Sequence, residues 1–114
     1  DMTDSMRTFA AHWKRIGVQF DCIMTGYCCT PAQIRLAAEF IRSFADDKTL
    51  VIVDPVLGDR EALYDGFTDA HVDAMRELCS LADLITPNRT EAALLAGLSF
   101  SCADETLLYA QKVK

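Results

Sequence analysis

The segment Leu50–Val53, "LVIV", limits the fold of this chain more than any other feature of the sequence. Its four aliphatic residues do not alternate with polar ones, which is typical of a parallel strand that is covered on both faces. Two further strand patterns, "FDCIMTG" from Phe20 and "DLIT" from Asp83, lie on either side of it, and a helical pattern separates each from "LVIV". Strands that alternate with helices pair in parallel through right-handed crossovers. The sequence therefore predicts an α/β fold with a mainly parallel sheet.

Apolar residues recur at intervals of three and four between the strands, which predicts amphipathic helices. Thr3 or Asp4 is expected to cap the first helix, and Pro31 suits the first turn of the second. The predicted helices cover residues 2–16, 31–45, about 69–81, 88–97 and 103–114. Residues 55–68 are rich in acids and helix breakers, so we expect a loop or a small hairpin there, with a flap at about 58–68.

Composition excludes several classes of partner. The 114 residues suit one domain, 1–114, and the net charge of -6 without a Lys/Arg run argues against nucleic acid. No apolar run is long enough to span a membrane, and no secretory signal is present. The five cysteines are odd in number and lack CxxC spacing, so we expect reduced thiols in a cytoplasmic protein. We expect His12 and His71 to be solvated, without a catalytic role.

The three predicted strands end in polar or turn-forming residues. Thr25-Gly26-Tyr27 follows the first strand, Asp54-Pro55 the second and Thr86-Pro87-Asn88 the third. Ligands of open parallel sheets bind outside the carboxyl ends of the strands. The sequence therefore predicts a functional site at this edge.

Carboxylates near this edge allow two interpretations. Asp54 and Asp59 flank Gly58, and such a pair suits Mg²⁺ that carries a nucleotide, although each acid alone is also a common turn former. Asn88 and Glu91 have the spacing of a capping box, which is a purely structural role. The alternative is a helix start that faces phosphate, with Glu91 near the metal. These roles compete for the Glu91 carboxylate.

Tyr27 and Tyr64 are the aromatic candidates for substrate contact. A tyrosine at a strand end is more often at the edge of the core, but an exposed ring packs well against an aromatic substrate. Both interpretations stay open from the residues alone.

Four stretches, "TGY", "VIVDPVLGD", "ALY" and "ADLITPNRTEAALLAG", resemble the pyridoxal kinases of the ribokinase-like superfamily. The resemblance implies a three-layer α-β-α fold, of which this chain carries the central part. It also implies ATP-dependent phosphorylation of the 5′-hydroxyl of pyridoxal, pyridoxine or pyridoxamine, with Mg²⁺ as cofactor and a monovalent cation as a further candidate. The same motifs do not separate this activity from that of a hydroxymethylpyrimidine kinase, and a sugar kinase is a further alternative.

The resemblance also assigns roles to individual residues. Tyr27 and Tyr64 are expected to bind the vitamer, with the flap that carries Tyr64 closing over it. Asp54, Asn88 and Glu91 are expected to bind ATP phosphates. We expect the metal site to consist of Asp54, Asp59 and Glu91.

The chain departs from the family's pattern in one respect. The catalytic base of the family is an aspartate in a "GTGD" loop, and no such motif follows Gly97, the last glycine. We therefore assign no catalytic residue to this chain, expect the base beyond Lys114, and expect no turnover by the chain alone. A non-catalytic binding or scaffold fragment is the alternative. Only three strands are evident, so we expect exposed sheet edges to make the isolated chain self-associate. The resemblance also implies that the whole protein is a homodimer.

Overall fold

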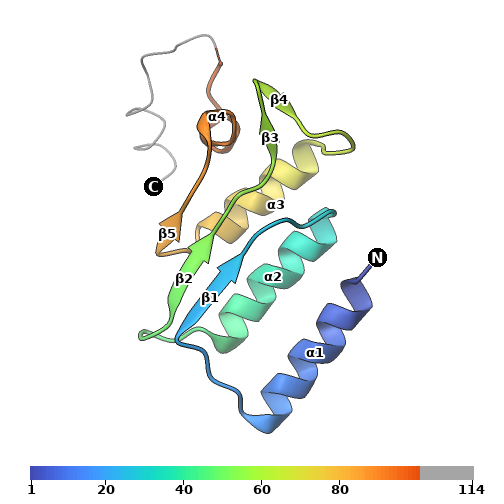
Figure 1. Cartoon of the computed structure of the whole chain (residues 1–114), viewed down its shortest axis with the longest axis vertical. Helices are drawn as coiled ribbons and strands as arrows, with labels where there is room; N and C mark the ends of the chain where they lie inside the picture. The colour runs from blue at the N-terminus through green and yellow to red at the C-terminus, as the bar shows by residue number, and fades with distance from the viewer. Residues whose placement is uncertain (101–114) are drawn as a thin grey trace.

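The computed structural model describes residues 1–100, in which helices and strands alternate along the chain (Figure 1). The predicted helix at 103–114 lies outside the described residues. The elements are α1 (Thr3–Ile16), β1 (Cys22–Thr25), α2 (Pro31–Phe44), β2 (Leu50–Val53), β3 (Gly58–Asp59), β4 (Ala62–Leu63), α3 (Asp69–Cys79), β5 (Leu84–Ile85) and α4 (Arg89–Ala96). The order confirms the predicted α/β fold class, and the expected hairpin is the β3–β4 pair.

The main sheet is parallel and has the order β1-β2-β5, with β2 in the centre. Ile23 pairs with Val51, and Ile52 pairs with Leu84. Both crossovers contain a helix, as parallel neighbours require. All three strands therefore end at the same edge.

The core lies between the sheet and the helices α2 and α3. Val53, Ile34 and Met75 are completely buried there. The opposite face of the sheet is different, because Met24, Leu50 and Leu84 are 69%, 47% and 51% exposed. Within residues 1–100 the sheet is thus covered on one face, and the cover of both faces that we inferred from "LVIV" is wrong for this part of the chain.

The helix ends follow local chemistry in most cases. Gly17 and Gly97 end α1 and α4 in the left-handed conformation that favours glycine. Pro31 is the first residue of α2, as predicted, and the Thr30 hydroxyl accepts a hydrogen bond from the Gln33 N–H at 3.1 Å.

The predicted cap of α1 is wrong. The helix starts at Thr3, so Met2 holds the capping position and makes no side-chain cap. The Thr3 hydroxyl instead accepts a hydrogen bond from Nε2 of Gln33 at 3.3 Å, and Asp4 forms an exposed ion pair with Arg7.

Aromatic rings join α1 to α2. Trp13 contacts Phe20 and Phe40 with ring centroids 5.8 Å and 6.0 Å apart, and Phe40 contacts Phe44 at 4.4 Å. Trp13 is half-buried, and α1 has no fully buried residue. No helix within residues 1–100 is long and apolar enough to cross a membrane.

Candidate functional site at the carboxyl edge of the sheet

The segments that leave β1, β2 and β5 lie beside one another at one edge of the sheet. The Asp54 N–H donates to the Thr25 carbonyl at 3.0 Å, and the Thr86 N–H donates to the Val53 carbonyl at 3.1 Å. These bonds extend the parallel pairing past the last strand residues. Tyr27, Asp54 and Asn88 follow these strand ends, so this arrangement brings the candidate residues to the edge that the sequence predicted.

Two hollows lie near this edge within residues 1–100, and neither is lined by all three residues. A mainly apolar cavity of about 600 Å³ lies between α1, α2 and β1, and its lining includes Thr25, Gly26 and Tyr27. A second hollow of about 400 Å³ lies between the β3–β4 hairpin and α4, and its lining includes Asp59 and Thr90. Asp54 and Asn88 line neither.

Two polar groups at this edge have no partner within residues 1–100. The Thr25 hydroxyl is buried and makes no hydrogen bond there. The half-buried Asp54 uses its backbone N–H and carbonyl, and no hydrogen bond or ion pair of its carboxylate occurs in that range. A buried polar group without a partner is uncommon, so both groups are available for a ligand.

The β3–β4 hairpin turns through Arg60 and Glu61, whose φ angles are 50° and 64°. Two consecutive positive φ angles are the mark of the type I′ turns that favour Asn and Gly. Gly58 is needed for another reason, because a Cβ atom there would overlap the Ala62 carbonyl oxygen and lie 2.9 Å from the Leu63 Cα. Asp59 is exposed on this hairpin, and its Oδ1 accepts the Arg60 N–H at 2.8 Å.

Asn88 and Glu91 form the capping box that their spacing predicted. The Asn88 Oδ1 accepts the Glu91 N–H at 2.9 Å, and the Glu91 Oε2 accepts the Asn88 N–H at 2.9 Å. The structural interpretation of this pair is therefore realised at the start of α4.

The same helix start also holds the hairpin. The Leu57 N–H donates to Glu91 Oε1 at 3.1 Å, and the Asn88 Nδ2 donates to the Gly58 carbonyl at 2.9 Å. The Glu61 N–H donates to the Thr90 hydroxyl at 3.0 Å. Thr90 was not among the sequence candidates, and only its place inside "TPNRTE" could have suggested it.

Glu91 is 4% exposed, and both of its oxygens accept backbone N–H groups. Direct contact of Glu91 with a metal would require one of these bonds to break. No group of three or more His, Cys, Asp or Glu side chains within residues 1–100 is arranged to hold a metal ion. Mg²⁺ usually takes only one or two carboxylates, with its other ligands from water and phosphate, so Asp54 and Asp59 stay the candidates for such an ion.

Three aromatic rings lie near one another between the loop after β1 and the segment after β4. The Phe67 ring centroid is 6.1 Å from those of Tyr27 and Tyr64. Tyr27 is 67% exposed and Tyr64 is 41% exposed, so neither belongs to the core. Phe67 was missed by sequence reasoning, because no periodic pattern covers its segment.

The expectation of a solvated His71 is wrong, whereas His12 is exposed as predicted. His71 is 5% exposed and lies in the first turn of α3. Its Nδ1 accepts the Thr68 N–H at 3.0 Å, which is the return bond of a capping box. The spacing of Thr68 and His71 in "TDAH" was the signal that could have predicted this position.

The four described cysteines are unpaired in the structure. Burial raises the pKa of the Cys79 thiol from its ordinary 9.0 to about 12, and the charge of Glu91 adds to this shift. Burial also raises the pKa of Cys28, with a further contribution from Cys29. Cys22 is exposed.

Comparisons with known proteins agree with the fold and the motifs. The family model described as phosphomethylpyrimidine kinase matches residues 7–114. Pyridoxine kinase of Bacillus subtilis is 36% identical over 104 residues, which cover 85% of this chain and 35% of that protein.

Two solved structures have the same fold over nearly the whole chain. The pyridoxal kinase of Lactobacillus plantarum has a TM-score of 0.92 and 34% identity, and the match covers 100% of this chain and 40% of that one. A Bacteroides thetaiotaomicron protein, assigned as a phosphomethylpyrimidine kinase and crystallised with pyridoxal, has a TM-score of 0.87 and 41% identity. That match covers 98% of this chain and 42% of the other. The chain spans about a third of the length of the curated relatives it matches, between 28% and 35% for the first three.

Proposed function

The chain belongs to the phosphomethylpyrimidine kinase family, and from this premise we propose that the whole protein phosphorylates vitamin B6. In this reaction the γ-phosphoryl group of ATP passes to the 5′-hydroxyl of pyridoxal, pyridoxine or pyridoxamine. One observation carries the proposal, namely that exposed tyrosines and unpaired polar groups lie at the carboxyl edge of a parallel sheet. The similarity to pyridoxine and pyridoxal kinases favours a B6 vitamer as the acceptor.

Tyr27 and Tyr64 supply ring faces for the pyridine ring of the vitamer. The unpaired Thr25 hydroxyl is a hydrogen-bonding group beside Tyr27 in the same cavity lining. The hairpin that precedes Tyr64 excludes water when it closes, which limits hydrolysis of ATP.

Asp54 and Asp59 are the proposed residues for Mg²⁺, which would neutralise charge on the ATP phosphates. The start of α4 places a positive helix end on the same side, with Asn88 at its cap. The Glu91 carboxylate accepts the Leu57 N–H, so we propose that Glu91 positions the segment around Leu57 beside the phosphates and the metal ion. Phosphoryl transfer depends mostly on positioning and charge stabilisation, and these residues supply both.

Phosphorylation of hydroxymethylpyrimidine is the second candidate, and the description of the matching family model favours it. Both acceptors are flat aromatic rings that carry a hydroxymethyl group. The aromatic wall of Tyr27, Phe67 and Tyr64 suits either one.

A substrate panel on the whole protein tests the proposal. Initial rates with MgATP are measured for pyridoxal, pyridoxine, pyridoxamine and hydroxymethylpyrimidine, with a sugar as the unrelated acceptor. We expect kcat/KM to be highest for a B6 vitamer. A preference for the pyrimidine would replace the proposal by the second candidate, and no turnover with any acceptor would favour a binding protein. The 114-residue chain alone is expected to show no turnover.

A further inference from the structure

Phe67 lies between the two tyrosines that we propose to bind the substrate. Its ring centroid is 6.1 Å from both the Tyr27 and the Tyr64 centroids, and the Tyr64 contact is edge to face with an interplanar angle of 89°. These distances lie in the range of favourable aromatic pairs. Phe67 is half-buried, whereas both tyrosines are exposed. Phe67 therefore forms the inner part of an aromatic wall whose outer parts face solvent.

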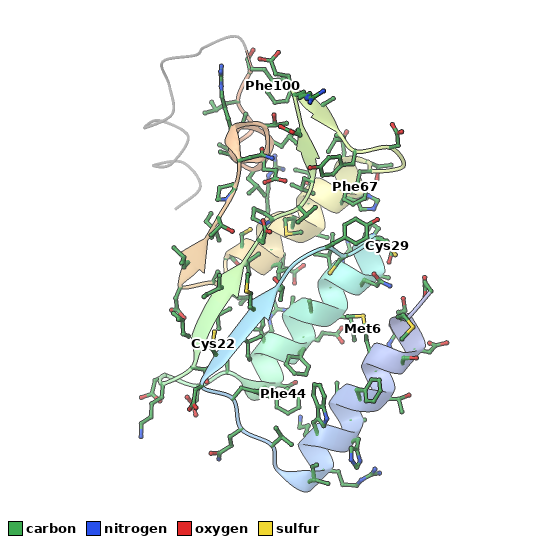
Figure 2. The ribbon with its side chains drawn as sticks, viewed as in Figure 1. Met6, Cys22, Cys29, Phe44, Phe67 and Phe100 are labelled. Atoms are coloured by element: carbon green, nitrogen blue, oxygen red, sulfur yellow. The ribbon has the colours of Figure 1, made fainter. Side chains whose placement is uncertain are left out.

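His71 supports Phe67 from the buried side. The imidazole and phenyl rings are stacked, with centroids 4.3 Å apart and an interplanar angle of 17°. The His71 Nδ1 accepts the Thr68 N–H, so Nε2 carries the ring proton and donates to the Cys29 carbonyl at 3.2 Å. Figure 2 shows Phe67 and Cys29 on neighbouring segments, one after β4 and the other before α2.

One histidine thus joins two segments that carry the candidate substrate residues. The Cys29 carbonyl belongs to the loop that contains Tyr27, and Thr68 ends the segment that contains Tyr64. The Cys29 N–H is held in turn by Oε1 of Gln33 at 3.0 Å, which fixes this loop on α2. The distance between the two tyrosines therefore depends on His71 and Phe67.

We propose that Phe67 and His71 are positioning residues that set the spacing of Tyr27 and Tyr64 for a flat aromatic substrate. This inference rests on the proposed function, because it assigns the two tyrosines to the acceptor and not to the nucleotide. Phe67 fills the space between the tyrosine rings, and His71 ties the Tyr27 loop to the segment after Tyr64. A change at either residue affects acceptor binding without touching the phosphates.

Steady-state kinetics of the whole protein test this. In Phe67→Leu, which keeps an apolar side chain but removes the ring, we expect KM for the aromatic acceptor to rise about 3- to 10-fold. KM for MgATP and kcat should change less than about 2-fold, because loss of uniform binding raises KM alone. Phe20→Leu is the matched control, since Phe20 is also half-buried among aromatic rings but precedes β1, at the other edge of the sheet, and lines neither hollow.

His71 is tested by a pair of variants. His71→Leu removes both hydrogen bonds and should raise KM for the acceptor, whereas His71→Gln keeps an acceptor and a donor and should restore part of the loss. ¹⁵N NMR of the His71 ring should show a proton on Nε2 and none on Nδ1 in the unchanged protein. A proton on Nδ1 would overturn the proposed link to Cys29.

The outcomes separate this inference from the proposed function. If the unchanged protein phosphorylates the pyrimidine and no B6 vitamer, the proposed function fails. The KM of the same variants is then measured with the pyrimidine as the acceptor. If an aromatic acceptor is used and Phe67→Leu leaves its KM unchanged, or Phe20→Leu raises that KM equally, the inference fails alone. A rise in KM for MgATP equal to that for the acceptor would also overturn it.

Discussion

The Glu91 carboxylate binds the backbone of Leu57, which lies 34 residues earlier in the chain, with an N–H to Oε1 distance of 3.1 Å. Its second oxygen accepts the Asn88 N–H. One buried side chain therefore connects the exit of β2, the hairpin and the start of α4. The order of these elements at the sheet edge depends on it.

We expect Glu91→Gln to destabilise the protein by about 1–3 kcal/mol, because the new amide group cannot accept both N–H groups and one is left buried without a partner. Urea unfolding measures this change, and hydrogen exchange should become faster at Leu57 and Asn88. The control is Glu77→Gln, which removes an exposed ion pair with Arg42 and should cost about 1 kcal/mol or less. Unchanged stability together with a loss of Mg²⁺ dependence would show a direct metal role for Glu91 instead.

Gly58→Ala should disrupt the hairpin, since its Cβ would overlap the Ala62 carbonyl oxygen. Relief of this overlap requires the backbone to move, and we expect a loss of about 1–3 kcal/mol. Gly26→Ala is the control, because no atom lies within 4 Å of a Cβ there and its φ is not positive. Thermal unfolding compares the two variants. Equal effects would mean that the close approach in the hairpin is not the cause.

Glu61→Gly should stabilise the protein by about 0.5–1 kcal/mol, because Glu61 has a φ of 64° that glycine adopts without strain. The bond from the Glu61 N–H to Thr90 is a backbone bond and is kept. Glu39→Gly, in the middle of α2, should cost about 1 kcal/mol, since the helix there has ordinary geometry. Destabilisation by both variants in urea would contradict the assignment of strain to the turn.

Asp59→Asn should raise KM for MgATP in the whole protein by about 10-fold or more, with a smaller effect on the vitamer, because the lost charge is proposed to face Mg²⁺ and phosphate. The control is Asp65→Asn, an exposed acid in the segment after β4. Kinetics at several Mg²⁺ concentrations measure the effect. The same dependence on MgATP in Asp59→Asn and the unchanged protein would refute the role of Asp59.

Thiol labelling of the native protein should modify Cys22 first and leave Cys79 and Cys28 largely unmodified, as peptide mass spectrometry resolves. Cys22 is exposed, whereas burial raises the pKa of the Cys79 thiol to about 12, so little thiolate forms there. The unfolded thiol, with an ordinary pKa of 9.0, loses its proton at lower pH than the folded one. The protonated Cys79 thiol therefore contributes to the free energy of unfolding fully below about pH 9, and this contribution is lost as the pH rises towards 12. Rapid labelling of Cys79 at neutral pH would contradict its burial.

Several local features could be predicted from the sequence because neighbouring residues decide them. The bounds of β2 match "LVIV", Pro31 starts α2, and Gly17 and Gly97 end their helices. These features depend on apolar runs, on a fixed φ angle or on freedom from a Cβ atom. The β3–β4 hairpin followed in the same way from its breakers.

The features that the sequence did not predict depend on residues far apart in the chain. His71 has a helical spacing that suits a solvated face, but it is buried, and its ring N–H donates to the Cys29 carbonyl, 42 residues away. Thr90 became part of the site only because the hairpin folds back onto α4.

Sequence alone thus determined the element types, the parallel pairing of the strands and the candidate residues at the strand ends, since these follow from periodicity and turn chemistry. The tertiary structure decided how the carboxylates are used. The Glu91 carboxylate accepts two buried N–H groups, those of Leu57 and Asn88, which would otherwise carry a desolvation cost. The Asp59 carboxylate instead accepts the neighbouring Arg60 N–H, and the Asp54 carboxylate binds neither of the two groups that Glu91 holds. The Asn88 N–H is a local donor that the capping-box spacing predicts, whereas the Leu57 N–H, 34 residues earlier, reaches Glu91 only through packing across the chain.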